Sequence, residues 1–195
     1  MALPINNEVI DQLFLKARSH NGWTPESVSD EQIQRLYQIL RQGPTAFNCC
    51  PARFVFIRTP EGRERIKPAL SANNADKALS APVLAVVAYD VVWFDLIPKL
   101  FPRDLSGMFR DNEALAYTTA MRNGSFQGAY MMLAARALGL DCGPMSGFNN
   151  EAVDKEFFPD GRWKSNFICA IGHGDPAAIR PQGPRLDFDT ACQLA

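Results

Sequence analysis

The sequence lacks features that define several large classes of proteins. Its 195 residues hold 20 Lys and Arg against 21 Asp and Glu, so no basic excess indicates nucleic acid or an anionic membrane as a partner. No apolar run is long enough to span a bilayer, and residues 1–7 do not have the layout of a signal peptide. We therefore expect a cytoplasmic protein with neither nucleic-acid nor membrane partners.

Cysteine and histidine are also too few, or too badly spaced, for common site types. The five cysteines include no C-x-x-C pair, and neither histidine lies near a cysteine in the sequence. The adjacent pair Cys49 and Cys50 suggests redox chemistry, but a bridge between neighbours is strained, so buried thiols are favoured. We expect free thiols, no disulfide framework and no metal site.

Sequence motifs of self-sufficient catalysis are missing as well. There is no G-x-G-x-x-G after a strand, no Walker loop and no G-x-S-x-G elbow. A Ser–His or Cys–His pair would have to use His20 or His173, and nothing in the sequence supports either. An enzyme with so few catalytic side chains would let a cofactor do the chemistry, so we assign no catalytic residue.

What is present indicates one domain spanning residues 1–195. The chain is 47% hydrophobic and long enough to bury a large core. Short continuous apolar runs, typical of strands covered on both faces, alternate with helical patterns. The strand candidates are 53–58, 83–88 and 166–172, and the helix candidates are roughly the first twenty residues, 29–43 and 113–138. This predicts an α+β layered domain, in which 89–111 is either a lid or a packed connection.

Small residues recur at every fourth position of the longest helix candidate: Ala116, Ala120, Gly124 and Gly128. Each glycine costs a helix roughly 1 kcal/mol relative to alanine, so the stripe needs a packing reason. We expect a close contact with another helix, in the same chain or at or beside an interface with a second subunit.

Two further segments could bind a ligand. Gly143–Phe148 combines two glycines and a proline, which indicates a shaped loop whose backbone N–H groups could face a flat ligand; the alternative is an ordinary turn. Arg18, Ser19 and His20 follow the first helix candidate. Such a cluster can hold a phosphate, or it can simply oppose the negative end of the helix.

Taken in order, five segments resemble the nitroreductase family of FMN-dependent oxidoreductases. Each motif alone is weak, but the five span nearly the whole chain. They are Arg18-Ser19, Gly43 to Phe54, Asn74 to Lys77, Gly143 to Phe148, and Pro184-Arg185-Leu186. The match is strongest to a subgroup that includes malonic semialdehyde reductases and proteins described as NADH dehydrogenase/NAD(P)H nitroreductases.

The resemblance implies a mostly antiparallel central sheet flanked by helices, in a domain-entwined homodimer with FMN at the subunit interface. It assigns cofactor contacts by region. The FMN phosphate would meet Arg18, Ser19, His20 and Arg185; the partner subunit would supply Pro44, Thr45, Ala46 and Asn48; the pyrimidine edge would meet Asn74 and Lys77. Pro144, Met145, Ser146 and Gly147 would cover the other face of the ring, with a backbone N–H near flavin N5.

The resemblance also implies an activity. A hydride would pass from NADH or NADPH through flavin N5 to a small acceptor, with ping-pong kinetics. The acceptor would be malonic semialdehyde, reduced to 3-hydroxypropionate, or a nitro compound or quinone. The alternatives are a flavin-dependent dehalogenase of the same family and a flavin-binding protein without turnover.

Overall fold

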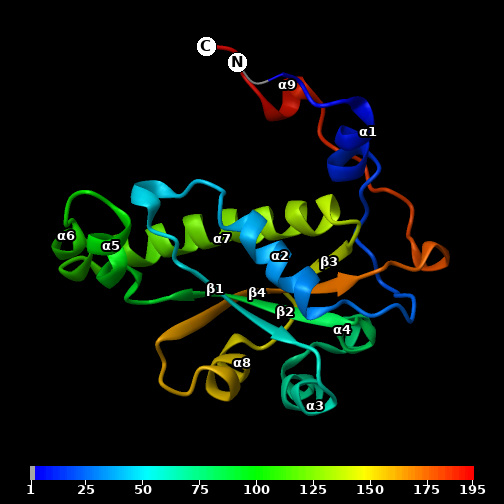
Figure 1. Cartoon of the computed structure of the whole chain (residues 1–195), viewed down its shortest axis with the longest axis horizontal. Coiled ribbons are helices and arrows are strands. Elements are labelled where there is room, and N and C mark those ends of the chain that lie inside the picture. Colours follow the sequence, from blue (N-terminus) through cyan, green and yellow to red (C-terminus); the bar gives the residue numbers. More distant parts are fainter. Residues whose placement is uncertain (1–2) are drawn as a thin grey trace.

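The computed structural model describes residues 3–195, and its centre is a four-stranded antiparallel sheet (Figure 1). The strands lie in the order β1 (Ala52–Ile57), β2 (Val83–Asp90), β4 (Trp163–Gly172) and β3 (Asp141–Met145). Every residue of β2 is buried, as the continuous apolar run predicts for a strand covered on both faces. The α+β architecture with an antiparallel sheet is confirmed.

Helices cover both faces of this sheet (Figure 1). On one face, α2 (Asp30–Leu40) and α7 (Glu113–Ala137) pack over a core that includes Val87 of β2 and Cys169 of β4. On the other face lie α3 (Pro60–Ile66), α4 (Ala72–Ser80) and α8 (Asn150–Phe157). The start of α2 is set by a capping box between Ser29 and Gln32.

The glycine half of the small-residue stripe on α7 faces the sheet, which corrects the expected helix–helix contact for Gly124 and Gly128. Ala116 and Ala120 belong to a buried cluster that also contains Trp93 and Phe109 of the helical segment after β2. A Cβ atom placed on Gly128 would collide with the ring of Phe167 on β4 and lie 3.4 Å from Val87 on β2. A Cβ atom on Gly124 would lie 3.7 Å from the Cβ of Tyr89. The two glycines therefore let the helix approach large side chains of its own sheet, a packing reason that the four-residue spacing could not distinguish from a second helix.

The segment 89–111 is a packed connection in this structure. It forms a 3-10 helix (Trp93–Leu96), α5 (Ile97–Leu100) and α6 (Ser106–Arg110). Trp93 and Phe109 are fully buried with their ring centroids 4.5 Å apart, and the indole Nε1 of Trp93 donates to the carbonyl of Ala116 at 3.1 Å. These contacts tie the segment to the first turn of α7.

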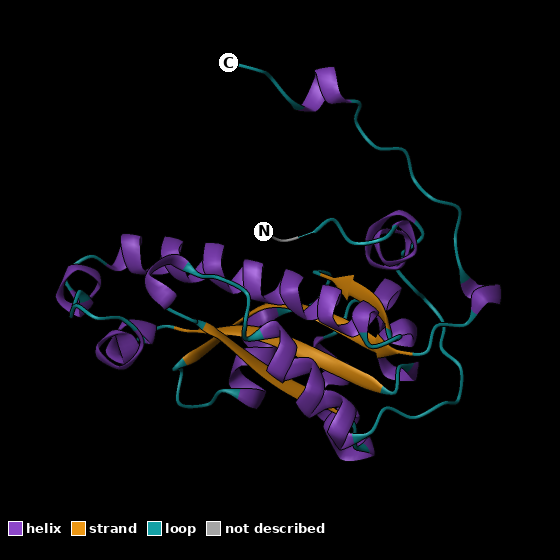
Figure 2. Cartoon of the chain, turned by 45° about the horizontal axis from the view of Figure 1, so that its top comes forward, coloured by secondary structure: helices purple, strands orange, loops and turns teal. Residues whose placement is uncertain are grey.

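The chain ends are the least packed parts of the described residues. The N-terminal helix is shorter than expected: α1 (Asn7–Ile10) continues as one π-helical stretch (Asp11–Leu15) and then stops. After a 3-10 helix (Pro176–Ala178), the C-terminal segment runs away from the body and carries only α9 (Phe188–Ala191) (Figures 1 and 2). Its apolar residues Leu186, Phe188 and Leu194 are exposed.

No helix within residues 3–195 combines the length and the apolar character needed to cross a membrane.

Candidate functional site

The site is built around the outer edge of β3. Ser19 forms a parallel bridge with Cys142, and the backbone N–H of His20 donates to the carbonyl of Cys142 at 3.0 Å. The segment Arg18–His20 therefore lies beside β3, joined to it by a single bridge. This pairing places the side chains of Arg18 and Ser19 at the sheet edge, close to the end of α7.

Arginines gather in a depression of about 330 Å³ at this edge. Its lining includes Arg18, Ser19, Arg136, Arg180 and Arg185, and no aspartate or glutamate. The Arg18 guanidinium donates to the carbonyl of Arg180, which ties the N-terminal segment to the C-terminal one. Because four fixed positive charges meet here without a carboxylate, the depression suits a doubly charged anion such as a phosphomonoester.

Two of these arginines are absent from the sequence prediction. Arg136 lies in the last turn of α7, where a cation is expected simply because it opposes the negative end of the helix dipole. Its Nη1 donates to the carbonyl of Leu13 at 2.8 Å, which turns the residue toward the N-terminal segment. Arg180 lies five residues before Arg185, and only its proximity to Arg18 in space reveals it.

Lys77 on α4 extends the positive charge toward β3. A Cβ atom on Gly143 would lie 3.6 Å from the Cδ of Lys77, an ordinary van der Waals distance that places the lysine side chain beside the strand. The same Cβ atom would lie only 2.6 Å from the backbone oxygen of His20, so the glycine is needed for the close approach of the Arg18–His20 segment. Burial lowers the pKa of Lys77, and the positive charge of Arg180 lowers it further. The lysine thus approaches the arginine depression without gaining a counter-ion.

The loop after β3 is held by α4. The carbonyl of Gly147 accepts from the backbone N–H of Ser71 at 3.2 Å and from Nδ2 of Asn74 at 3.1 Å. The N–H of Phe148 donates to the carbonyl of Ser146 at 3.0 Å. Because C=O and N–H point in opposite directions across a trans peptide, the N–H of Gly147 is aimed away from Phe148.

The side chains of Asn74 and Met145 are placed differently from what a ligand contact would need. Nδ2 of Asn74 holds the loop, so part of this amide serves the protein rather than a ligand. The side chain of Met145 is buried in the core beneath β3, and only its backbone lies at the surface of the sheet edge. Pro144, the preceding residue of the strand, is half-buried, and Ser146 is exposed.

The ring of His20 also lies outside the depression. Its side chain is only 6% exposed, and its Nε2 lies 3.2 Å from Oδ1 of Asp141. A direct contact between this imidazole and a phosphate, as the resemblance implies, is therefore not supported by its place in the fold.

The loop of residues 44–48 lies elsewhere in the chain. The carbonyl of Pro44 accepts from the Tyr130 hydroxyl at 3.0 Å, and the N–H of Ala46 donates to Asn123 Oδ1 at 2.8 Å. Thr45 lines the same surface, and Nδ2 of Asn48 donates to the carbonyl of Leu100 at 3.0 Å. From Asn123 to Arg136 the axis of α7 advances about 20 Å, so one chain does not unite the 44–48 loop with the arginines.

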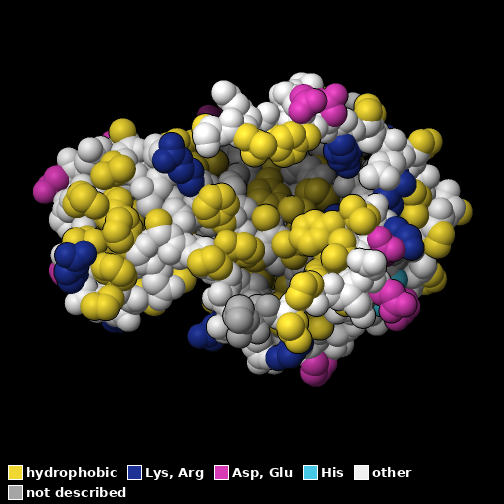
Figure 3. All heavy atoms as spheres, turned by 90° about the horizontal axis from the view of Figure 1, so that it is seen from above, with side chains coloured by type: hydrophobic (Ala, Val, Ile, Leu, Met, Phe, Trp, Pro, Cys, Tyr) yellow, Lys and Arg dark blue, Asp and Glu magenta, His cyan; other side chains and the backbone are white. Residues whose placement is uncertain are grey.

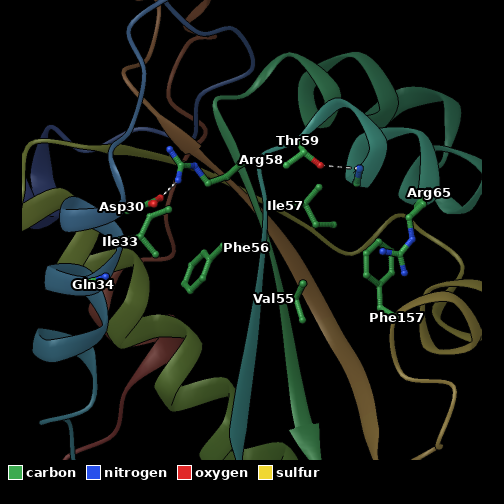
Figure 4. Close-up of a pocket in the computed structure, with 11 residues that line it drawn as sticks. Asp30, Ile33, Gln34, Val55, Phe56, Ile57, Arg58, Thr59, Arg65 and Phe157 are labelled. Carbon is green, nitrogen blue, oxygen red and sulfur yellow. Dashed lines mark hydrogen bonds and ion pairs between the residues drawn. The ribbon is translucent and has the colours of Figure 1, made fainter.

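A larger hollow of about 540 Å³ lies along the free edge of β1, and it makes a poorer candidate (Figure 4). None of the predicted site residues lines it. Its cations already have partners: Arg58 pairs with Asp30, and the Arg65 guanidinium lies 4.7 Å from the centre of the Phe157 ring while its Nε donates to Glu156. Among residues 3–195, no cluster of histidine, cysteine and acidic side chains could hold a metal ion.

Comparison with known proteins finds a family that matches most of the chain. The family model described as "Nitroreductase family" matches residues 15–173. A protein of Cupriavidus pinatubonensis is 51% identical over 193 residues, covering 97% of this chain and 98% of its own, and carries the assigned name NADH dehydrogenase/NAD(P)H nitroreductase. A Ralstonia pickettii protein with the same assigned name and the symbol HadB is 50% identical, covering 94% and 95% of the two chains.

Solved structures share the fold at low sequence identity. A nitroreductase of Bacillus subtilis superimposes with a TM-score of 0.86 at 20% identity, over 97% of this chain and 100% of its own. A nitroreductase of Exiguobacterium sibiricum, solved in complex with FMN, superimposes with a TM-score of 0.84 at 18% identity, over 100% and 99% of the two chains.

Proposed function

Because the chain belongs to the nitroreductase family, we propose that it is an FMN-dependent oxidoreductase that uses NADH or NADPH to reduce a small acceptor. The observation that carries the proposal is the arginine depression. Lys77 lies near enough to feel the charge of Arg180, and Asn74 on the same helix holds the loop of Ser146 and Gly147. These elements suit three chemical groups in turn. The arginines suit a phosphate, Lys77 suits an electron-rich ring edge, and the loop suits a flat ring face.

The residues near β3 fit two parts of FMN, its phosphate and the pyrimidine edge of its ring. Arg18, Ser19 and Arg185, joined by Arg136 and Arg180, would hold the phosphate, because forked guanidinium groups suit its oxygens. Lys77 would lie at the pyrimidine edge. FMN, when bound, would accept a hydride from NAD(P)H and pass it to the acceptor.

The protein's own groups would tune this chemistry. The Lys77 ammonium favours negative charge at the ring edge because it has no other anion to stabilise it. The N–H of Gly147 shares its peptide with the carbonyl of Ser146, which accepts from the N–H of Phe148, so this N–H would keep one direction toward the ring face. Ser71 and Asn74 hold the next peptide through the carbonyl of Gly147. A Cβ atom on Gly147 would lie 2.5 Å from Nδ2 of Asn74, so a larger residue would break this arrangement.

A homodimer would complete the site. The loop Pro44–Asn48 is too far along α7 to reach the arginines of its own chain, so a second copy is the natural source of these residues. The exposed Leu186 and Phe188 of the C-terminal segment need a surface to cover them, and the face of the molecule seen from above is hollowed and lined with hydrophobic side chains (Figure 3). A second copy of the chain would supply that surface.

For the acceptor we propose malonic semialdehyde, reduced to 3-hydroxypropionate, with nitro compounds and quinones as further substrates. The support is the likeness to the subgroup described above. No nucleotide-binding motif is present, so NAD(P)H and the acceptor would use the same space over the ring in turn.

The test begins with protein purified after expression with added riboflavin. Retention of FMN is followed by absorbance, and NADH and NADPH oxidation is measured with malonic semialdehyde, a quinone and a nitroaromatic compound. We expect bound FMN, turnover with at least one acceptor and parallel lines in double-reciprocal plots. Bound FMN without turnover would indicate a binding protein, halide release from a halogenated aromatic would indicate a dehalogenase, and intersecting lines would refute the shared space.

A further inference from the structure

Three residues from distant parts of the chain meet behind the segment that carries Arg18 and Ser19. Nε2 of His20 lies 3.2 Å from Oδ1 of Asp141, and the other carboxylate oxygen of Asp141 accepts from the backbone N–H of Gly174 at 3.0 Å. The imidazole rests on Gly174 so closely that a Cβ atom there would overlap Nδ1. One carboxylate therefore links β3, the residue after Ser19 and the turn that follows β4.

This contact is buried, and it uses the imidazole on one side only. The His20 side chain is 6% exposed, and its Nδ1 has no hydrogen-bond partner within residues 3–195. The carboxylate can only accept, so the hydrogen on the ring is assigned to Nε2. The imidazole is thus enclosed and directed at Asp141, with no nitrogen facing the arginine depression.

The same segment is fastened on both of its sides. Its backbone is bridged to Cys142 on β3, while Trp23 is bridged to Gly174, and the N–H of Thr24 donates to the carbonyl of His173 at 2.8 Å. The side chain of His20 fills the space between these two pairings. Removing the ring, or pushing it out, would leave Arg18 and Ser19 attached to β3 through backbone contacts alone.

We propose that His20, Asp141 and Gly174 form a clamp that positions Arg18 and Ser19 for the phosphate of FMN. The proposal rests on the proposed function for its ligand and assigns His20 a positioning role in place of a direct phosphate contact. Asp141 and Gly174 gain a role that the sequence motifs do not give them.

The direction in which Asp141→Ala changes FMN affinity distinguishes the clamp from a purely electrostatic role of Asp141. Asp141 is a negative charge one residue from Cys142, and so lies near the phosphate-binding segment. If it acted only through its charge, Asp141→Ala would strengthen the binding of an anion. If it acts through the clamp, the same substitution weakens FMN binding because Arg18 and Ser19 lose their fixed place.

The experiment measures dissociation constants of FMN and of riboflavin, which lacks the phosphate, for the full-length protein. We expect His20→Ala, Asp141→Ala and Gly174→Ala each to weaken FMN binding about tenfold, the size of one charge-assisted hydrogen bond. Riboflavin affinity should change little, and it also shows that each variant is folded. His20→Gln and Asp141→Asn should recover most of the FMN affinity, since an amide can still donate or accept in the same place.

Two comparisons sharpen the result. The double variant His20→Ala/Asp141→Ala should lose no more FMN affinity than either single variant, because both remove the same clamp. Glu26→Ala is the matched control: Glu26 Oε1 lies 3.2 Å from Nε2 of His173, a similar histidine–carboxylate pair that does not line the arginine depression. The contact of His173 with Thr24 is made by its backbone carbonyl, so the substitution leaves that contact in place. It should leave the preference for FMN over riboflavin unchanged.

Each outcome decides a separate question. A wild-type protein that binds FMN no better than riboflavin would refute the phosphate site of the proposed function. A wild-type preference that survives His20→Ala and Asp141→Ala, or FMN binding that tightens in Asp141→Ala, would refute the clamp. Equal losses of FMN and riboflavin in the alanine variants would also refute it, since they would show a general structural role.

Discussion

Replacing Lys77 with methionine should make FMN harder to reduce once it is bound. The side chain keeps nearly its length but loses its charge. In the folded protein, burial and the nearby Arg180 lower the pKa of Lys77, and none of the ion pairs among the described residues includes this lysine. The charge is therefore held without a counter-ion, and it favours any ligand that becomes more negative beside it.

The size of the effect follows from Coulomb's law. Two unit charges 4 Å apart near a protein surface interact by about 4 kcal/mol. Lys77 is only half-buried and solvent screens it, so about 1–3 kcal/mol of preference for the reduced ring is a reasonable range. For a two-electron couple this corresponds to a midpoint potential lower by roughly 20–65 mV in Lys77→Met.

The pH dependence of stability gives a second measure of the same charge. Because the pKa of Lys77 lies below its ordinary value of 10.5, protonation costs the ligand-free protein stability. That loss is fully present below the lowered pKa and is relieved as pH rises toward 10.5. In Lys77→Met the ligand-free protein should lose this rise, and its thermal midpoint at neutral pH should be higher than that of the wild type.

The assay is a spectroelectrochemical titration of the FMN-loaded protein, with Lys77→Arg as the control that keeps the charge. Lys77→Arg should stay near the wild-type potential, although its guanidinium is bulkier. A potential in Lys77→Met that remains within about 10 mV of wild type would refute the assigned place of Lys77 at the ring edge.

Three further predictions test other parts of the structure. Arg18→Ala and Arg185→Ala should each weaken FMN roughly ten- to a hundredfold but leave riboflavin nearly unchanged, measured by fluorescence titration; equal losses would place these arginines away from the phosphate. On α7, Gly124→Ala should raise the free energy of unfolding by about 1 kcal/mol, while Gly128→Ala should lower it by about 1–3 kcal/mol because its Cβ meets Phe167; urea unfolding that gives both the same sign would contradict this packing. Leu186→Ser/Phe188→Ser should dissociate the proposed dimer in sedimentation experiments, and a dimer of unchanged strength would show that the C-terminal segment is not covered by a partner.

Much of the fold could be predicted from local patterns. The apolar run of β2 and the capping box of Ser29 and Gln32 are determined by residues close in sequence, so pattern and structure agree. The partner of the α7 stripe could not be predicted, because small residues at every fourth position permit a close approach by either a helix or a sheet. The predicted length of the first helix was wrong for a related reason. None of the residues in α1 or in the π-helical stretch after it is buried, so the apolar face does not pack against a core within the described part of the chain.

The candidate site likewise contains residues that the sequence could predict and residues that it could not. Arg18 and Arg185 are recognisable as a pair only through the family resemblance, and the structure brings both to one depression. Arg180 and Arg136 were missed because an isolated arginine in a tail or at a helix end has an ordinary explanation. The place of His20 depends on Asp141 and Gly174, more than a hundred residues further along the chain, and no local pattern contains that information.

The strand order also determines when the protein can fold during its synthesis. β4 is the last strand to leave the ribosome, yet it lies between β2 and β3 in the sheet. One edge of β2 therefore stays unpaired until residues 163–172 have been synthesised. At about 5–20 residues per second, β2 stays in that state for several seconds or longer. A strand that is apolar from Val83 to Ala88 and has an open edge invites pairing with other chains. The nascent protein should therefore depend on chaperones most strongly in the interval between the completion of β2 and the arrival of β4.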